Sequence, residues 1–278
     1  MNGLAESLFT TLFPSDCRIC SNPLTNISRL PVCQECLSTM RPMIAKLCSL
    51  CGERLPGLYV VTSQTGETLC GICRRITPPY ERAMAYGSYD GGLRELVHLL
   101  KYERVRPAAN VLGRMLAEVL ANLEPSFGEA PVLLIPVPLH SSKQRQREFN
   151  QTELIAHAAL KLRPSDRLSL SLKALERRRA TQSQIGLSSH QRRENMRGAF
   201  AVMQSQEIKD REILLVDDVF TTGTTVSECA RVLRRAGASK VWVATVARTL
   251  KLETHFAQPP VEEAPAVEPV AVRMAAAG

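Results

Sequence analysis

The chain has 278 residues, 45% of them hydrophobic and 22% charged, a balance that suits one sizeable α/β domain and a smaller module. The last 24 residues carry three glutamates against one arginine, so the net charge of +8 rises to about +10 without them. That excess favours an anionic ligand, either a phosphorylated small molecule or nucleic acid. No run approaches the roughly 18 consecutive apolar residues of a membrane span, which excludes membrane insertion. We see no signal peptide either, and we expect a cytoplasmic protein with reduced thiols.

Eight of the nine cysteines form four C-x-x-C turns near the N-terminus: Cys17/Cys20, Cys33/Cys36, Cys48/Cys51 and Cys70/Cys73. Two such turns complete one tetrahedral zinc site with four cysteine ligands, so four turns predict two sites. The intervening gaps of 12, 11 and 18 residues allow sequential pairing of the turns or an interleaved, RING-like pairing. We favour sequential pairing, because each site then closes local loops. A redox C-x-x-C of thioredoxin type is a single motif and fits less well.

We expect residues 1–78 to form a double zinc-ribbon module with two structural zinc ions. Its basic residues either contact nucleic acid or form a solvated surface: Arg18, Arg29, Arg41, Lys46 and Arg54. The ninth cysteine, Cys229, is most simply a small core residue.

Strands and helices alternate through residues 79–250. We expect strands at 83–89, 132–137, 168–172, 213–216 and 241–247, and helices at 93–102, 111–120, 149–160 and after 225. We further expect a loop over 139–148 and a flexible basic stretch reaching residue 200. This alternation predicts a parallel sheet with helices on both faces. Pro136 removes a ladder hydrogen bond, so its strand must end unusually or lie at an edge. Residues 251–278 are rich in Pro, Ala and Glu, and we expect a disordered tail.

The most informative stretch is residues 212–226. A buried strand leads into Asp217 and Asp218, and then into a loop of hydroxyl residues around one glycine: Thr221, Thr222, Gly223, Thr224 and Thr225. Backbone N–H groups at the following helix start favour an anion, and the carboxylates can accept hydrogen bonds from ribose hydroxyls. The pattern predicts a site for a phosphorylated sugar. It lacks the Walker A and dinucleotide spacings, and the plainer alternative is a βα turn with a Thr-rich cap.

Residues 214–225, LLVDDVFTTGTT, resemble the phosphoribosyl pyrophosphate (PRPP) motif of type I phosphoribosyltransferases. Residues 135–139 (IPVPL), 147–151 (REFNQ) and 181–184 (TQSQ), with Arg192, Asn195, Gly198 and Phe200, resemble elements of the ComF/GntX family. That family joins zinc ribbons to a phosphoribosyltransferase-like domain, and the resemblance covers about residues 15–250. Position 148 departs from the pattern, because it is Glu where the family usually has Gly. A backbone that must adopt positive φ there, or approach pyrophosphate, would be disturbed.

The resemblance implies a type I phosphoribosyltransferase fold and a link to DNA uptake or DNA processing in bacteria. It implies that Asp217 and Asp218 hold the ribose hydroxyls and that the loop of residues 221–225 holds the 5′-phosphate. Mg²⁺ would accompany the diphosphate. Candidates for catalysis are Arg147, Lys101 and Arg192, with Lys143 on the pyrophosphate and Gln184 in a mobile loop over 178–197. The run of residues 177–179 is more simply a solvated face.

Two functions follow from this reading. The first is Mg²⁺-dependent phosphoribosyl transfer by a pentosyl glycosyltransferase, with the acceptor left open. The second is a non-catalytic module that binds PRPP or a nucleotide and engages single-stranded DNA, or a DNA-uptake or helicase partner.

Overall fold

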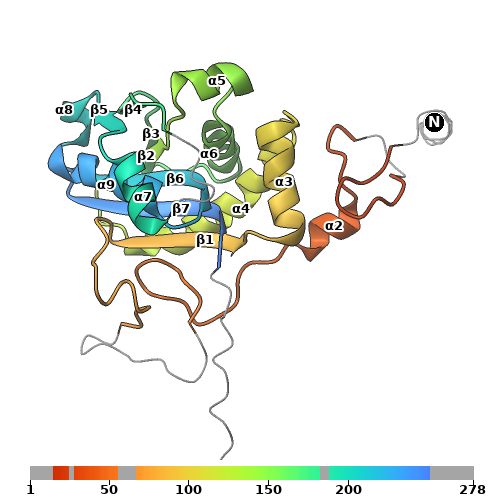
Figure 1. Cartoon of the computed structure of the whole chain (residues 1–278), viewed down its shortest axis with the longest axis horizontal. Helices are drawn as coiled ribbons and strands as arrows, with labels where there is room; N and C mark the ends of the chain where they lie inside the picture. Colours follow the sequence, from red (N-terminus) through yellow and green to blue (C-terminus); the bar gives the residue numbers. More distant parts are fainter. Residues whose placement is uncertain (1–14, 25–27, 56–66, 182–187, 251–278) are drawn as a thin grey trace, which may run out of the picture.

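The computed structural model describes residues 15–24, 28–55, 67–181 and 188–250 (Figure 1). Its centre is a five-stranded parallel sheet in the order β1-β7-β6-β2-β3. The strands are β1 (Arg82–Ser88), β2 (Val132–Pro136), β3 (Leu168–Leu170), β6 (Glu212–Phe220) and β7 (Lys240–Arg248). The helices that pack on the sheet are α3 (Gly91–Tyr102), α4 (Ala108–Leu123), α6 (Gln151–Leu162) and α9 (Thr224–Arg235). A short 3-10 turn, η1 (Glu124–Ser126), follows α4. The predicted parallel α/β sheet is confirmed.

Strand β6 shows why these strands are continuously apolar. Leu214 and Val216 join the core formed with α3, α4 and α6, whereas Ile213 and Leu215 join the core formed with α9. Alternate side chains therefore enter opposite cores, and neither face of the strand meets water. Helices α4 and α6 approach closely at Gly113, where an added Cβ would lie 2.5 Å from the Ala158 side chain.

Pro136 closes β2, which lies between β6 and β3 rather than at an edge. The amide of Val137 donates to the carbonyl of Val216 in β6. Because successive residues of a strand direct their backbone groups to opposite neighbours, the position of the missing N–H of Pro136 faces β3. Strand β3 pairs with β2 only as far as Leu134, and no strand residue is opposite the missing N–H. Of the two alternatives, an unusual strand end is therefore the one observed.

Two regions are more structured than the sequence predicts. Residues 139–148 contain a helix, α5 (Ser141–Arg147), which the His140 side chain caps by accepting from the amide of Ser142. The basic stretch before residue 200 contains β4 (Leu175–Arg177) and α7 (Ser189–Met196). Strand β4 pairs with β5 (Phe200–Val202), and a short helix, α8 (Ser205–Ile208), follows. These polar segments lack the apolar periodicity that identifies helices and strands, so the loop predictions there were wrong.

The cysteine-rich segment packs against the sheet domain at two separate places (Figure 1). Cys17, Cys36 and Met40, around helix α2 (Gln34–Thr39), join the core of α3 and α4. Cys48 and Cys70 join the opposite core. The predicted core position of the ninth cysteine, Cys229, is confirmed by its complete burial on α9. None of the described helices has both the length and the apolar character that crossing a membrane requires.

Candidate phosphoribosyl site

The acid pair lies where β6 approaches the carboxyl edge of the sheet, and its two members have different surroundings. Asp218 is buried, with Lys101 Nζ at 2.8 Å from Oδ1 and Gln151 Nε2 donating to Oδ2 at 2.8 Å. The Asp217 side chain accepts from the amide of Asp218 at 2.9 Å. The Asp218 carboxylate is thus paired with a cation of the protein, whereas the Asp217 carboxylate accepts a hydrogen bond from the adjacent backbone amide.

The charge balance of the pair follows from these contacts. Burial, and then the neighbouring Asp218 carboxylate, raise the pKa of Asp217 to about 7. Burial opposes the charge on Lys101, but the Asp218 carboxylate outweighs it and raises the pKa of the lysine. Lys101 therefore stays protonated beside Asp218 at neutral pH, and Asp217 is the carboxyl that would gain most from a cation or a hydroxyl donor.

Next to the acid pair is a cavity of about 260 Å³. It is lined by Tyr89, Lys101, Val137, Pro138, Leu139, Lys143, Arg147, Gln151, Thr152, Arg177, Thr181, Asp217, Asp218, Val219, Thr221 and Thr225. Helix α9 begins at this edge, so its unpaired N-terminal amides and its dipole favour an anion there. The cavity brings together two carboxylates, two loop hydroxyls and four basic side chains, a set that complements a sugar carrying phosphate groups.

The loop itself is set by Gly223, which caps α9 with a φ of +73°. An added Cβ there would lie 2.4 Å from the ring of Phe220, so the turn needs glycine both for its backbone angle and for space. Thr221 and Thr225 line the cavity. The hydroxyls of Thr222 and Thr224 lie 2.8 Å apart and hydrogen-bond to each other.

Three further basic side chains line the cavity: Lys143, Arg147 and Arg177. Arg147 of α5 donates to Gln151 Oε1 at 3.0 Å, and its guanidinium lies 5.3 Å from the centre of the Tyr102 ring. Burial, followed by the charges of Arg177 and Arg147, lowers the pKa of Lys143. A lysine made less basic by crowded cations is stabilised by an incoming anion.

The structure brings most of the predicted residues to this cavity. Lys101 and Arg147 line it, together with both aspartates. Arg192 lies on α7, and the described lining residues do not include it. Gln184 and the tail of residues 251–278 lie outside the described residues.

Sequence reasoning missed several lining residues, most notably Arg177, which we expected on a solvated face. Its guanidinium donates to Thr181 Oγ1 and lies 5.4 Å from the centre of the Phe200 ring, and burial lowers its pKa. Gln151 was visible only as part of a motif, without its role as a partner of Asp218. One sequence signal could have identified Arg177. It lies two residues after the buried Leu175 in the short strand β4, and so on the same face of the strand.

Glu148 does adopt positive φ, at +69°, as the C-cap of α5. Its carboxylate turns to Arg104, with Oε1 at 2.5 Å from the guanidinium, and both side chains are about half exposed. The described cavity lining does not include Glu148, so its charge is held by Arg104 rather than directed at the cavity.

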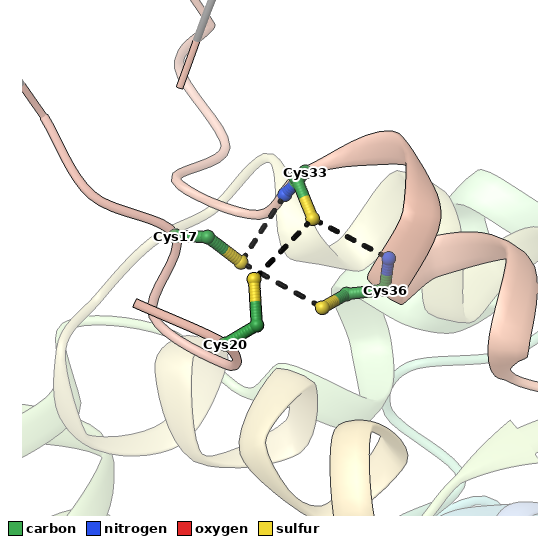
Figure 2. Close-up of side chains that lie close together, drawn as sticks. All are labelled: Cys17, Cys20, Cys33 and Cys36. Carbon is green, nitrogen blue, oxygen red and sulfur yellow. Dashed lines mark hydrogen bonds between the residues drawn. The ribbon is translucent and has the colours of Figure 1, made fainter. Parts of the chain in front are cut away.

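The cysteines form two clusters, Cys17/Cys20/Cys33/Cys36 and Cys48/Cys51/Cys70/Cys73, and within each the sulfurs lie within 4.8 Å of one another. The turns are therefore paired sequentially. Figure 2 shows the four side chains of the first cluster converging, with Cys33 and Cys36 at the start of α2. The Sγ–Sγ distances are 3.8 Å for Cys17–Cys36 and 3.7 Å for Cys20–Cys33. In the second cluster the Sγ atoms of Cys51 and Cys70 lie 3.7 Å apart. A tetrahedron with Zn–S bonds of about 2.3 Å has edges of about 3.8 Å, so both clusters fit a metal ion of that size.

Comparison with known proteins places this arrangement in a family. A domain family described as the phosphoribosyl transferase domain matches residues 155–260. DNA utilization protein YhgH of Salmonella typhimurium is 32% identical over 238 residues, covering 85% of this chain and 98% of that protein. Competence protein F of Haemophilus influenzae is 28% identical over 224 residues, covering 78% of this chain and 96% of that protein. A hypoxanthine phosphoribosyltransferase structure from Staphylococcus aureus gives a TM-score of 0.33 at 13% identity, covering 51% of this chain and 68% of that one. The chain belongs to the ComF/GntX family, whose members join a cysteine-rich N-terminal segment to a phosphoribosyltransferase-like domain.

Proposed function

We propose that the chain binds PRPP with Mg²⁺ and transfers its phosphoribosyl group to an acceptor in the service of DNA uptake or DNA processing. The observation that carries the proposal is the cavity in which Asp217, Asp218 and the loop of residues 221–225 face basic side chains. The aspartates would hold the ribose hydroxyls, and the loop with the start of α9 would hold the 5′-phosphate. The names of the relatives, DNA utilization protein and competence protein, supply the biological setting.

The leaving group would lie against Lys143 and Arg147, with Arg192 as a further candidate from α7. Displacing pyrophosphate requires its charge to be neutralised, and cations fixed in a small cavity do this without reorganisation. Mg²⁺ suits the oxygens of the diphosphate and the carboxylate of Asp217. The ion would supply charge neutralisation there, and the chain's own residues would orient the sugar.

One observation favours a second function, binding without turnover. Lys101 is committed to Asp218 at 2.8 Å, so it is not free to meet a leaving group. A module of this kind would bind PRPP or a nucleotide and engage single-stranded DNA or a DNA-processing partner.

Calorimetry with PRPP and Mg²⁺ tests the shared part of both functions. We expect binding by the wild-type protein and a loss of at least about tenfold in the Asp217→Asn, Asp218→Asn double variant, since each lost charged hydrogen bond is worth more than about 1.4 kcal/mol. Asp166→Asn is the matched control, because Asp166 is exposed and precedes β3 at the far end of the sheet. Equal affinity in the double variant and the wild type would remove Asp217 and Asp218 from the site.

Release of pyrophosphate with a panel of bases and amines separates the two functions. Acceptor-dependent release supports transfer. Tight PRPP binding with no release across the panel supports the non-catalytic module.

Binding of single-stranded DNA has its own test. The basic residues predicted to face nucleic acid are all exposed on the cysteine-rich segment: Arg18, Arg29, Arg41, Lys46 and Arg54. The logarithm of oligonucleotide affinity falls linearly with the logarithm of salt concentration, with a slope set by the number of phosphate contacts. If Arg29, Arg41 and Lys46 each contact a phosphate, reversing their charges should reduce the magnitude of this slope by about two. An unchanged slope in fluorescence anisotropy excludes this surface.

We further propose that each cysteine cluster holds one structural zinc ion. All four ligand positions are thiolates, which leaves no open position for catalysis. Such sites persist where thiols stay reduced, which supports a cytoplasmic location. We also propose that the zinc-ribbon module ends at residue 78 and that the phosphoribosyltransferase-like domain spans residues 79–250.

A further inference from the structure

A buried arginine joins the second cysteine cluster to the candidate site. Arg248 is the last residue of β7 and is only 4% exposed. Its guanidinium donates to the carbonyl oxygen of Cys51 at 2.5 Å and to Glu53 Oε2 at 2.9 Å. The same guanidinium lies 4.4 Å from the centre of the Phe220 ring. One side chain therefore contacts both the turn that carries the cluster and the residue immediately before the loop of residues 221–225.

Phe220 in turn packs directly against that loop at Gly223. Its ring lies so close to Gly223 that a methyl group there would overlap it, at 2.4 Å. The ring is held on another side by Tyr80, edge to face at 6.4 Å, and the Phe220 carbonyl accepts from Thr249 at 3.0 Å. A shift of the ring would therefore be felt directly at the turn that begins α9.

The turn between Cys48 and Cys51 is itself fixed to the sheet. Gly52 adopts a φ of +70°, and an added Cβ there would lie 3.0 Å from the carbonyl oxygen of Ala83 in β1. Ala83 donates its amide to Leu50 at 2.7 Å. The guanidinium of Arg248 thus lies between two features. One is the turn at Cys51, which packs against β1, and the other is the Phe220 ring, which packs against the loop of residues 221–225.

We propose that Arg248 is a positioning residue for the phosphoribosyl site, and that it holds Phe220 and the Gly223 turn in place by anchoring them to the turn of residues 51–53. This rests on the proposed function in one respect, the assignment of the loop to the 5′-phosphate. The contacts predict a selective effect. Loss of the guanidinium should loosen the half of the site that binds the 5′-phosphate and spare the half formed by Lys143 and Arg147, which are on α5.

Hydrogen exchange on the ligand-free protein tests the positioning without any substrate. In Arg248→Met we expect amides of residues 220–226 to exchange about tenfold faster, as expected for loss of a desolvated cation–π contact, while those of β2 stay unchanged. Phe220→Leu leaves the pair of Arg248 and Glu53 in place and should give the same local effect, so the inference stays testable if Arg248→Met does not fold. Unchanged exchange at residues 220–226 in a folded Arg248→Met variant overturns the proposal, and so does unchanged exchange in Phe220→Leu if Arg248→Met does not fold.

A matched control separates positioning from general destabilisation. Glu212 lies at the opposite end of β6 and holds Lys240 and Trp242 of β7 by hydrogen bonds. Glu212→Gln therefore disturbs the same pair of strands from the far end. It should lower thermal stability while residues 220–226 exchange as in the wild type. If it accelerates them as much as Arg248→Met does, a specific role for Arg248 is excluded.

Two ligands probe the two halves of the site separately by calorimetry. Arg248→Met should weaken ribose 5-phosphate by about tenfold and leave inorganic pyrophosphate nearly unchanged. Equal loss for both ligands contradicts the positioning role. If the wild-type protein binds neither ligand nor PRPP, the proposed function fails, and the exchange experiment still decides whether Arg248 holds the loop.

Discussion

At the scale of single residues, the two adjacent aspartates differ because their partners differ. Asp218 is satisfied by Lys101 and Gln151, whereas Asp217 has a raised pKa in a polar cavity. If Asp217 serves binding and destabilises the folded protein, replacing it by a neutral side chain should increase stability.

We expect Asp217→Asn to stabilise the protein at pH 8. The folded-state pKa is about 7 and the usual value is 3.8, so the native state binds more protons than the unfolded state between these values. Wild-type stability therefore falls as the pH rises through this window. The variant lacks this titration, and its advantage should shrink as the pH is lowered from 8 to 5. Thermal unfolding at several pH values measures it, and a variant less stable than wild type at pH 8 contradicts the strain at Asp217.

Glu148→Gly should leave stability unchanged or raise it by up to about 1 kcal/mol. Glycine relieves a left-handed backbone that costs about 1 kcal/mol or more, while the exposed pair with Arg104 contributes at most about 1 kcal/mol. Glu148→Ala is the control, because it loses the pair and keeps the strain, and it should be destabilised. Urea unfolding of the three proteins decides whether the backbone or the ion pair dominates.

At the scale of elements, β6, its loop and α9 act as one unit, because the ring of Phe220 at the strand end fills the space that a side chain at Gly223 would need. The site depends on the angle at which the helix leaves the strand. That angle is fixed by a glycine with no room for a methyl group.

Gly223→Ala should therefore cost about 1–3 kcal/mol and abolish ribose 5-phosphate binding, since it combines positive φ with overlap. Gly198→Ala is a close control, because Gly198 has a φ of +68° but nothing within 4 Å of the added Cβ. It should show the backbone cost alone and retain binding. Similar behaviour of the two variants in calorimetry would mean that contact with Phe220 is unimportant.

The sequence was most informative where local chemistry and burial act together. Leu214 and its neighbours identify a strand buried on both faces, and the acid pair with Gly223 identifies its ligand end. It was least informative for Arg177 and α5, whose placement depends on long-range packing of short polar segments. Gln151 reaches Asp218 across 67 positions of sequence, a contact that no local pattern encodes.

At the scale of the whole molecule, the cysteine-rich segment contributes to both cores of the sheet domain. The first cluster joins α3 and α4, while the second lies in the opposite core, where Cys51 accepts from Arg248. The proposed boundary after residue 78 therefore divides the chain by composition, and tertiary contacts cross it.

Removal of metal should lower the unfolding temperature, with unequal contributions from the two clusters. Cys70→Ser should be the more damaging, because all four cysteines of its cluster are buried, whereas in the first cluster Cys20 is exposed and Cys33 half-buried. The matched variant Cys33→Ser should retain more structure. Zinc content by mass spectrometry and thermal unfolding with and without a chelator test this, and two clusters with no bound metal would exclude structural zinc.

The contact between Arg248 and Cys51 spans 197 residues, and this has a consequence for synthesis on the ribosome. At translation rates of 5–20 residues per second, the second cluster emerges roughly 10–40 s before the strand that covers it. During that interval its thiols are open to solvent, to oxidants and to other nascent chains. In the absence of metal, chains stalled before residue 240 should leave Cys51 reactive to thiol reagents, and full-length chains should protect it. Early capture of metal would then safeguard the nascent chain as well as stabilise the finished one.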